Sequence, residues 1–578
     1  MAEPIAAICG RNGYQTELEQ LSAAASGWAQ TAATDRLVVL AELRAALVPL
    51  TARWAETAAR IKQSPPGSRF EGEEWLSGPL AMLTAYDGFA DTLRRLPGKA
   101  FLRGLRSRSL PSGQLALRVL PRTFWDRVLY SGITAEVWMQ PGVTRANLAS
   151  HAAATWDIAP AARQAGVALV LGAGNITSIA PLDCLYKLLV EHQVVALKLN
   201  PVLEGLAPVL AEALAPLIRR DLLRIFRGDG ADGGWLATHP LIKTIHITGA
   251  GATHDAIVWG AGAEGAANKA AGRRQNPRQV TSELGAVCPT IVVPGPWSQA
   301  DIAFQGEHIA TQKLHNSGFN CIACQALVLP EGWAQAAPLL AALEAVVAGS
   351  GARPAWYPGA AARLADFAVA GGAGARSVQR GTTLPLVLVD LDAAENPAPL
   401  LRAEVFGPAL AVKRLPAADP EAFLRAAIDW ANGELHGTLG ANILIHPATL
   451  RRIGRRQFDQ IIAGLRYGTI AVNGWTGIGF LMAQTPWGAF PGHTPEDVQS
   501  GIGVVHNTLM LDAAECSVIR APWAPFPRGL RYGLSLLPRP PWFITHRRAR
   551  VVGRLLTDFV ASPAVGKLPR LLLATLRG

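Results

Sequence analysis

The stretch GVALVLGAGNITSIAPLDCLYKLLVEHQVVALKLNP (166–201) decides the fold of this chain. An apolar run enters a glycine-containing turn, a helical segment follows, and a second apolar run ends at Lys198. The alternation continues through LAPVLAEALAPLIRR (206–220), LLRIFRG (222–228) and IKTIHITG (242–249). Apolar strands that alternate with helices of this length predict βαβ units and a parallel sheet.

The flanking segments extend this α/β pattern in both directions. Residues 35–62 have apolar positions at helical spacing, whereas 105–140 alternates apolar and polar residues and predicts strands or a hairpin. A second α/β lobe begins near QVTSELGAVCPTIVVPG (279–295) and includes the strand-like runs CQALVLP and TLPLVLVDL. It ends near 466–474, and GGAGARSVQRG (371–381) is expected to be a loop.

The C-terminal region differs in composition from the rest of the chain. From Ser517 to Gly578 there are eleven Lys or Arg residues and one acidic residue, so this segment carries almost all of the net charge of +11. ITHRRARVVGRLLTDFV (544–560) predicts a short basic amphipathic helix. The aromatic residues Trp523, Phe526, Trp542 and Phe543 are interleaved with these basic residues. We expect this tail to lie on an anionic membrane surface or to cover a substrate entrance; the alternatives are a solvated basic appendage and a segment packed on a partner subunit.

Composition excludes several classes of protein. Half of the 578 residues are hydrophobic and only 17% are charged, which excludes wholesale disorder. The charge outside the tail is nearly balanced, so no nucleic-acid surface is expected. Six sparse cysteines exclude a disulfide scaffold and lack zinc-ligand spacing, and the N-terminus has no signal-peptide pattern. We expect a cytoplasmic protein with reduced thiols and no bound metal.

Cys321 is the first candidate for chemistry, in the glycine-containing polar turn of HNSGFNCIACQ (315–325). A cysteine in such a turn can be a thiolate nucleophile. Taken alone, a buried packing residue is the more common role of a cysteine, and a redox pair with Cys324 is a weaker alternative because such pairs usually open a helix. Glu283 precedes a Leu-Gly turn beside an apolar run, where burial would raise its pKa and suit a general base; the alternative is a solvated strand end.

Four other positions carry candidate binding groups. Asn175 follows a strand and a glycine turn, so its amide can donate to an oxyanion or cap a helix. Lys198 ends a parallel strand, where cofactors bind, although a solvated lysine is equally expected there. The small-residue turn at Thr248-Gly249 allows close approach of a diphosphate. Glu404, in RAEVFGPAL, can anchor a ligand hydroxyl or cap a turn.

Taken in order, these segments resemble the aldehyde dehydrogenase superfamily over about residues 140–505. The resemblance rests on six motifs and on the closing segment GTIAVNGWTG…TPWGAFPG (468–492). The motifs are Asn175, Lys198, Thr248-Gly249, Glu283-Leu284-Gly285, Asn316-x-Gly318-x-x-Cys321 and Glu404-x-Phe406-Gly407-Pro408.

The resemblance implies a reaction and a role for each site residue. Cys321 would attack an aldehyde carbon to give a thiohemiacetal, with Asn175 and the Cys321 amide holding the oxyanion. Hydride transfer to NAD or NADP would leave a thioester, which Glu283 would hydrolyse by activating water. Lys198, Thr248, Gly249, Glu404 and Phe406 would form the cofactor site.

Departures from the family pattern leave open which cofactor the protein uses and which product it forms. Phe319 and Ala286 replace a glutamine and a glycine, and Leu199 stands where a proline is usual. Pro201 occupies the position of a glutamate that reads the ribose 2′-hydroxyl, with Glu204 displaced, so NAD or NADP stays open. A coenzyme A-acylating relative and a catalytically inactive, membrane-associated scaffold are the alternatives to the hydrolytic enzyme.

The resemblance also implies a domain organisation. The predicted fold has a Rossmann-like cofactor domain over 1–282, a catalytic α/β domain over 283–467 and an oligomerisation flap. The hairpin at 110–142 and the closing segment 468–505 would build that flap in a homo-oligomer, and 506–578 would form the basic extension. The expected partner is a small, apolar aldehyde, with peripheral membrane contact through the tail.

Overall fold

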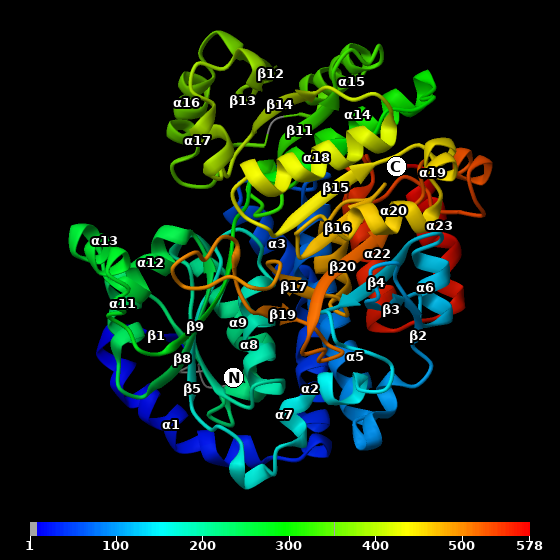
Figure 1. Cartoon of the computed structure of the whole chain (residues 1–578). Coiled ribbons are helices and arrows are strands. Elements are labelled where there is room, and N and C mark those ends of the chain that lie inside the picture. The colour runs from blue at the N-terminus through cyan, green and yellow to red at the C-terminus, as the bar shows by residue number, and fades with distance from the viewer. Residues whose placement is uncertain (1–7, 352) are drawn as a thin grey trace.

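The computed structural model describes residues 8–351 and 353–578, which build two large sheets (Figure 1). The first has seven strands in the order β1-β7-β6-β5-β8-β9-β18. Its members are β1 (Ile8–Cys9), β5 (Val167–Leu171), β6 (Val194–Lys198), β7 (Leu223–Phe226), β8 (Ile242–Gly249), β9 (Gln279–Leu284) and β18 (Gly501–Ile502). The strands predicted around 166–249 are therefore confirmed.

The helices that connect these strands cover both faces of the sheet. The ones that bear on the site are α8 (Ile179–Leu189), α11 (Gly230–Thr238) and α12 (Gly251–Trp259). Every residue of β6 is buried, which explains why this strand is a continuous apolar run and not an alternating one. Only its last residue, Lys198, is charged, and it lies at the carboxyl end, the edge of a parallel sheet where ligands bind.

The second sheet has eleven strands in the order β12-β13-β14-β11-β10-β15-β16-β20-β4-β3-β2. Its strands are β2 (Arg106–Ser109), β3 (Leu115–Leu120), β4 (Thr134–Met139), β10 (Cys288–Val292), β11 (Cys324–Pro330), β12 (Ala375–Arg380), β13 (Thr383–Asp390), β14 (Ala409–Leu415), β15 (Gly440–Leu444), β16 (Thr469–Val472) and β20 (Ala514–Arg520). The run from β13 to β20 is parallel, as expected for the second α/β lobe.

The segment at 110–142 forms strands, and they belong to the eleven-stranded sheet of the chain itself. β2, β3 and β4 are antiparallel, β4 pairs with β20, and β20 pairs in parallel with β16. A short helix, α6 (Phe124–Leu129), interrupts the hairpin between β3 and β4. A role of this hairpin in oligomerisation stays a prediction.

The expectation of a loop at 371–381 is wrong. Residues Ala375–Arg380 form β12, which pairs antiparallel with β13 at the edge of the large sheet. Most of its side chains are exposed or half-buried, so the strand has little need of apolar residues. Because a polar edge strand lacks the apolar pattern of a core strand, its sequence is typical of a loop.

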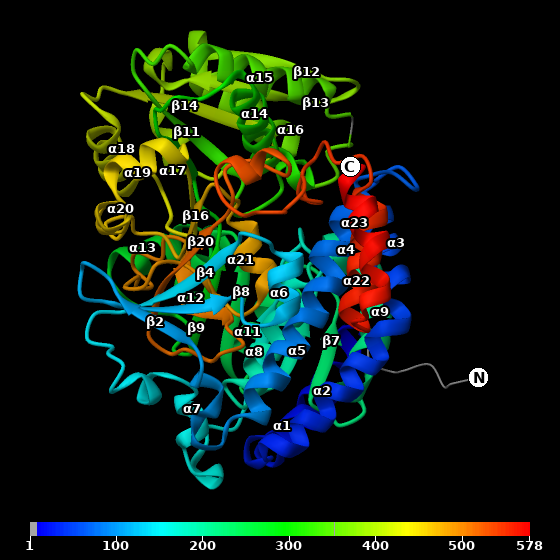
Figure 2. The same ribbon diagram turned by 90° about the vertical axis from the view of Figure 1, so that its right-hand side faces the viewer.

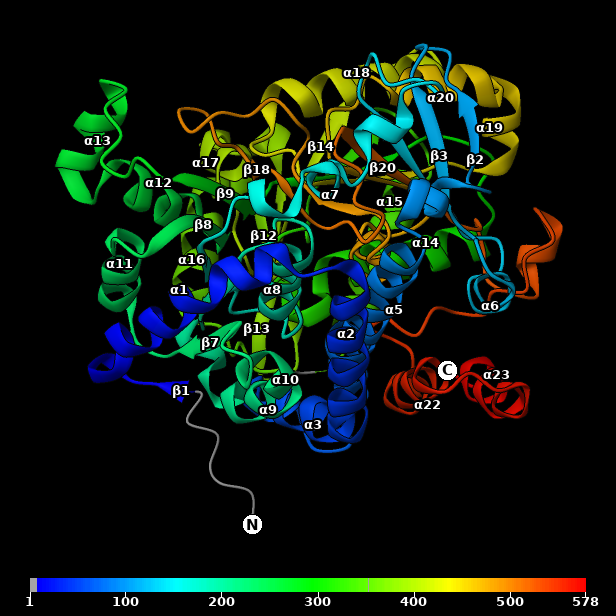
Figure 3. The same ribbon diagram turned by 90° about the horizontal axis from the view of Figure 1, so that it is seen from below.

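The tail folds back onto the chain instead of extending from it. The predicted helix is α22 (Ala549–Ala561), followed by α23 (Leu568–Leu576), and the two form a hairpin on the side shown in Figures 2 and 3. α22 packs against α4 (Glu71–Trp75) and the π-helix Leu76–Leu80 that follows it. Of its buried residues, Val552 clusters with Leu571 of α23, and Phe559 contacts Trp125 of α6. Within the described residues, no helix combines the length and the apolar character needed to cross a membrane.

Candidate active site

Cys321 lies on a turn between α14 (Gln299–Leu314) and β11, in the second α/β lobe. Asn316, Ser317 and Gly318 all have positive φ, which lets the chain reverse within a few residues. A Cβ on Gly318 would lie 2.8 Å from the backbone of Gly407, so only glycine fits where these two segments meet. The turn therefore joins two of the family-like motifs.

A buried ion pair supports this turn from the N-terminal helices. Glu73 on α4 accepts a hydrogen bond from the Asn316 amide at 2.9 Å and pairs with Arg353 at 2.7 Å. Burial opposes ionisation of Glu73, but Arg353 and the Asn316 amide outweigh it and lower its pKa. A charged Glu73 thus fixes the backbone five residues before the cysteine.

Glu283 lies at the end of β9, opposite Gly501 of β18. Its side chain is buried, and neither carboxylate oxygen has a partner with normal hydrogen-bond geometry among the described residues. Burial raises its pKa to about 7, and the nearby charge of Asp183 acts in the same direction. The thiol of Cys321 and the indole of Trp487 approach the carboxylate and only partly offset this rise.

Glu404 brings a second carboxylate to the same place. It packs so closely on Gly285 that a Cβ there would lie 1.9 Å from its Oε2. Its Oε1 is buried and unpartnered among the described residues. Burial and then the charge of Glu283 raise the pKa of Glu404 to about 8. The glycine of the Glu-Leu-Gly motif therefore makes room for the Glu404 carboxylate.

These two acids set the state of the Cys321 thiol. Burial raises the pKa of Cys321 well above its usual value, and the charges of Glu283 and Glu404 raise it further. The thiol is therefore neutral in this arrangement, and its proton has a nearby acceptor in Glu283. A base with a pKa near neutrality can take that proton and return it.

Asn175 reaches this turn from the other sheet. It follows β5, is buried, and its Nδ2 donates to the carbonyl of Phe319 at 3.0 Å. Asn316 Nδ2 donates to the same carbonyl at 3.0 Å and to the carbonyl of Asn175 at 3.2 Å. The two side-chain amides thus connect the seven-stranded sheet to the segment that carries Cys321.

A small apolar cavity of about 40 Å³ opens at Cys321. Its other lining residues are Leu76, Ser77, Ile176, Ile179, His315, Asn320, Ile322, Trp475, Gly477, Phe480, Leu481, Trp487 and Trp542. Trp542 comes from the basic extension and is 7% exposed, so the extension forms part of the cavity wall.

The predicted cofactor residues lie at the carboxyl edge of the seven-stranded sheet. Lys198 Nζ donates to the carbonyl of Gly228, and Glu204 accepts from the Gly228 amide at 2.9 Å. Burial lowers the pKa of Lys198, and the charge of Glu204 partly restores it. A carboxylate therefore does lie beside Lys198, although it is displaced in the sequence.

The turn after β8 offers backbone and not side-chain contacts. The Thr248 hydroxyl is directed inward and donates to Asp183 at 2.9 Å. A Cβ on Gly249 would make only ordinary van der Waals contacts, and a Cβ on Gly251 would have no neighbour within 4 Å. The backbone of this turn is therefore not crowded by other side chains. Because α12 begins at Gly251 without a side-chain cap, its first amides can receive an anionic diphosphate. This cradle and the unpartnered oxygen of Glu404 fit a dinucleotide.

Phe406 belongs to an aromatic cluster behind the thiol turn. Its ring lies 4.9 Å from that of Tyr357 and 5.8 Å from that of Phe319. Phe319 in turn contacts Trp356 edge-on at 5.4 Å. The phenylalanine that replaces the family's glutamine therefore packs as a core residue.

Comparison with known proteins places these features in a family. The sequence profile described as the aldehyde dehydrogenase family matches residues 194–488, about half of the chain. Among curated proteins, no sequence matches significantly. The chain belongs to the aldehyde dehydrogenase family, as the sequence motifs predicted, and its mixed α/β fold is the fold of that family.

Solved structures agree on the fold at low sequence identity. γ-Glutamyl-γ-aminobutyraldehyde dehydrogenase from Burkholderia cenocepacia J2315 is 17% identical, with a TM-score of 0.58 over 88% of this chain and 89% of that one. An aldehyde dehydrogenase of Mycobacterium tuberculosis complexed with NAD⁺ is 16% identical, with a TM-score of 0.58 over 87% and 89%. A mutant of aldehyde dehydrogenase C from Pseudomonas syringae, complexed with NAD⁺ and octanal, is 16% identical, with a TM-score of 0.57 over 89% of each chain.

Proposed function

We propose that this protein oxidises an apolar aldehyde to a carboxylic acid with NAD or NADP as hydride acceptor. The observation that carries the proposal is the meeting of the half-buried Cys321, the buried Glu283 and an apolar cavity. An isolated buried cysteine would be a packing residue, but a thiol beside an unpartnered acid with a pKa near 7 is equipped for proton transfer. The solved relative that holds octanal supports an apolar substrate.

Each residue of the site would have a separate role in the reaction. Cys321 forms a bond to the aldehyde carbon while its proton passes to Glu283, and Asn175 Nδ2 with the Cys321 amide holds the oxyanion. When bound, the cofactor supplies the hydride acceptor. Glu283 then releases the first proton to solvent and takes a second one from the water that attacks the thioester, and it returns this proton to the sulfur of Cys321 as the acid leaves. Lys198, the turn at Gly249 and Glu404 would hold the cofactor.

The position of Glu204 favours NAD. Its carboxylate lies beside Lys198, where an acidic group accepts a hydrogen bond from a ribose 2′-hydroxyl and repels a 2′-phosphate. A coenzyme A-acylating reaction is the alternative outcome, because another thiol can replace water at the thioester. The retained base Glu283 favours hydrolysis.

A panel of aldehydes of increasing chain length tests the proposed function. Rates are measured with NAD and with NADP, with and without coenzyme A, and the product is identified. We expect free acid, NADH formation without coenzyme A, and loss of activity in Cys321→Ala and Glu283→Gln. NADH formation that requires coenzyme A and yields no free acid would overturn the hydrolytic assignment.

We propose further that the extension contacts an anionic lipid surface, although only one of the four predicted aromatic residues is exposed for it. Trp523, Trp542 and Phe543 are buried in the protein itself, whereas Phe526 is exposed. The other exposed large apolar side chains of the extension are Leu530, Leu534, Leu536, Val565, Leu572, Leu573 and Leu576. They lie in the segment 526–536 and around α23, and arginines stand between them in the sequence.

The combination of arginine with exposed leucine is complementary to an acidic bilayer. Flotation with phosphatidylglycerol vesicles should recover the protein, and flotation with phosphatidylcholine should not. Leu534→Asp with Leu536→Asp should abolish recovery. Val369→Asp, at a residue that is 77% exposed on α16 (Ala360–Gly371), is the matched control and should not. Equal recovery of both variants would remove the proposed contact.

A further inference from the structure

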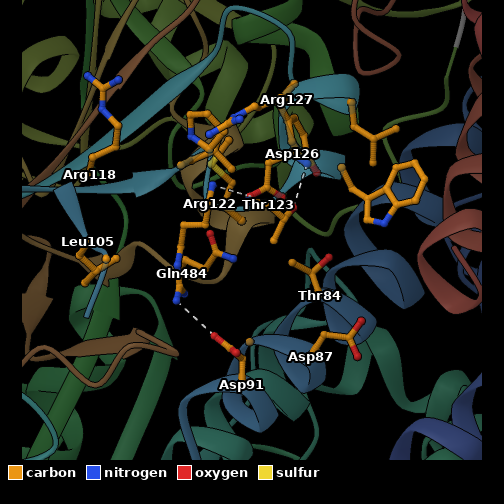
Figure 4. Close-up of a pocket in the computed structure, with 18 of the residues that line it drawn as sticks. Thr84, Asp87, Asp91, Leu105, Arg118, Arg122, Thr123, Asp126, Arg127 and Gln484 are labelled. Atoms are coloured by element: carbon orange, nitrogen blue, oxygen red, sulfur yellow. Dashed lines mark hydrogen bonds and ion pairs between the residues drawn. The ribbon is translucent and has the colours of Figure 1, made fainter. Parts of the chain in front are cut away.

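A large, arginine-rich cavity lies away from Cys321. Its volume is about 1030 Å³, and it lies between α5 (Ala81–Arg94), the strands β2 and β3, α6 and the end of α22 (Figure 4). Six arginines line it, against three aspartates. The arginines are Arg95, Arg103, Arg106, Arg118, Arg122 and Arg127, and the aspartates are Asp87, Asp91 and Asp126.

The aspartates do not neutralise these arginines. Asp87 pairs with Arg44 at 2.9 Å, which is not a lining residue. Asp126 accepts from the backbone amides of Arg122 and Thr123 in the capping box of α6. Asp87 is therefore engaged by an arginine outside the cavity, whereas Asp126 keeps its negative charge and acts on Arg122.

The remaining aspartate serves two arginines. Asp91 pairs with Arg95 and, at 3.2 Å, with Arg122. Arg118 is drawn away to Glu136 at 3.4 Å, an acid that also binds Arg108. In the described chain, Arg103, Arg106 and Arg127 have no carboxylate within 4.0 Å.

One wall of the cavity is apolar and rigid. Trp125 contacts Phe559 edge-on at 5.1 Å, and Val560 and Leu129 line the same cavity. The floor contains two unsatisfied buried polar atoms, Nε of Arg95 and Oε1 of Gln484. A surplus of guanidinium groups facing an aromatic and aliphatic wall is suited to a ligand with a phosphate and an apolar part.

We propose that this arginine cavity is a binding site for a multiply charged phosphorylated ligand. Guanidinium groups bind phosphate oxygens through paired N–H donors, and Arg103, Arg106 and Arg127 are exposed and available for such contacts. The site is independent of the proposed oxidation chemistry, because none of its lining residues is a candidate catalytic residue. The phosphate belongs either to a soluble metabolite or to a lipid headgroup.

The two cavities share one element. α21 (Gly477–Met482) supplies Gly477, Phe480 and Leu481 to the cavity at Cys321. Its last residue, Met482, and the nearby Gln484 line the arginine cavity. A ligand in the arginine cavity would therefore contact the end of the helix that borders the substrate.

Calorimetric titration of the full chain with inorganic pyrophosphate tests the site without using activity. We expect saturable binding that Arg103→Gln with Arg127→Gln weakens at least about tenfold, since each variant removes a charge-assisted contact. Arg455→Gln with Arg456→Gln, two exposed arginines at the start of α20 (Arg455–Ile462), is the matched control and should bind as wild type. Absence of saturable binding, or equal weakening by both pairs, would overturn the proposal.

A second pair of probes distinguishes the sources of the phosphate. Dihexanoyl phosphatidic acid below its micelle concentration is compared with glycerol 3-phosphate, which has the same headgroup without acyl chains. Tighter binding of the lipid, lost in Phe559→Ser, supports a headgroup whose chains lie on the apolar wall. Equal binding supports a soluble phosphorylated ligand. If neither binds while pyrophosphate does, the site selects a diphosphate.

Discussion

The cavities on the two sides of α21 differ in every property that decides what they bind. The cavity at Cys321 is small, apolar and enclosed by indole and aliphatic side chains. The arginine cavity is more than twenty times larger in volume and strongly basic. No cysteine lines the larger cavity, and Asp87, a lining carboxylate whose pKa burial raises, is paired with Arg44. Size therefore indicates where a ligand fits, and perturbed protonation indicates where chemistry occurs.

Substitution of Cys321 has the largest expected effect, because it tests whether chemistry occurs in the small apolar cavity. Cys321→Ala removes the only described thiol that lines the apolar cavity, so aldehyde oxidation should fall by about 10⁴-fold. Initial rates of NADH formation measure the effect. Cys324→Ala, three residues further on and buried in β11, should keep most of the activity. Comparable losses of activity in both variants would mean that oxidation depends on the structure of this turn and not on the Cys321 thiol.

Glu283→Gln should give the next largest effect, about 10²- to 10³-fold on turnover. In the unchanged protein the base must be ionised, and its pKa is raised to about 7. The hydrolytic rate should therefore rise with pH through about 7 and level off above it. A pH profile of kcat measures this. A profile that is flat between pH 6 and 8 would show that Glu283 is not the titrating group.

Trp542→Ala should change the choice of substrate more than the rate. Removing the indole opens the wall that the extension contributes, so longer aldehydes should gain about tenfold in kcat/KM relative to short ones. Trp542→Phe, which keeps an aromatic ring, should stay close to the unchanged protein. An unaltered chain-length profile in Trp542→Ala would mean that the extension does not border the bound substrate.

Glu204→Gln should have the smallest effect, about fivefold in the ratio of NAD to NADP use, because one nearby charge is removed. The ratio of kcat/KM for the two cofactors is the measurement. We expect NADP use to increase and NAD use to decrease. An unchanged ratio would place the 2′ position away from Lys198 and Glu204.

Sequence reasoning identified the parts of the site that depend on local pattern. The βαβ units around 166–249 were predictable because buried parallel strands are continuous apolar runs. Cys321, Glu283 and Glu404 were found through their order along the chain. Their meeting at one point was implied only by the resemblance, because β9, the thiol turn and the segment before β14 are brought together by tertiary packing.

Other parts had no usable signal in the sequence. Glu73 and Arg353 meet the thiol turn from positions more than 240 and about 30 residues away, and nothing local marks either as a support. Trp542 was noted as an aromatic of the tail, but its place in the cavity wall depends on how the extension folds back. The arginines of the large cavity come from separate short segments, so their convergence is visible only in three dimensions.

The most direct test of the active-site assignment is to trap the acylated thiol. Glu283→Gln protein is mixed with an aldehyde and NAD⁺, and intact mass and peptide mapping follow. Because hydrolysis is blocked while attack by the thiol is slowed less, we expect an acyl group on the peptide that contains Cys321, with about one equivalent of NADH released per chain. NADH release without an adduct at Cys321, or an adduct on another residue, would contradict the account.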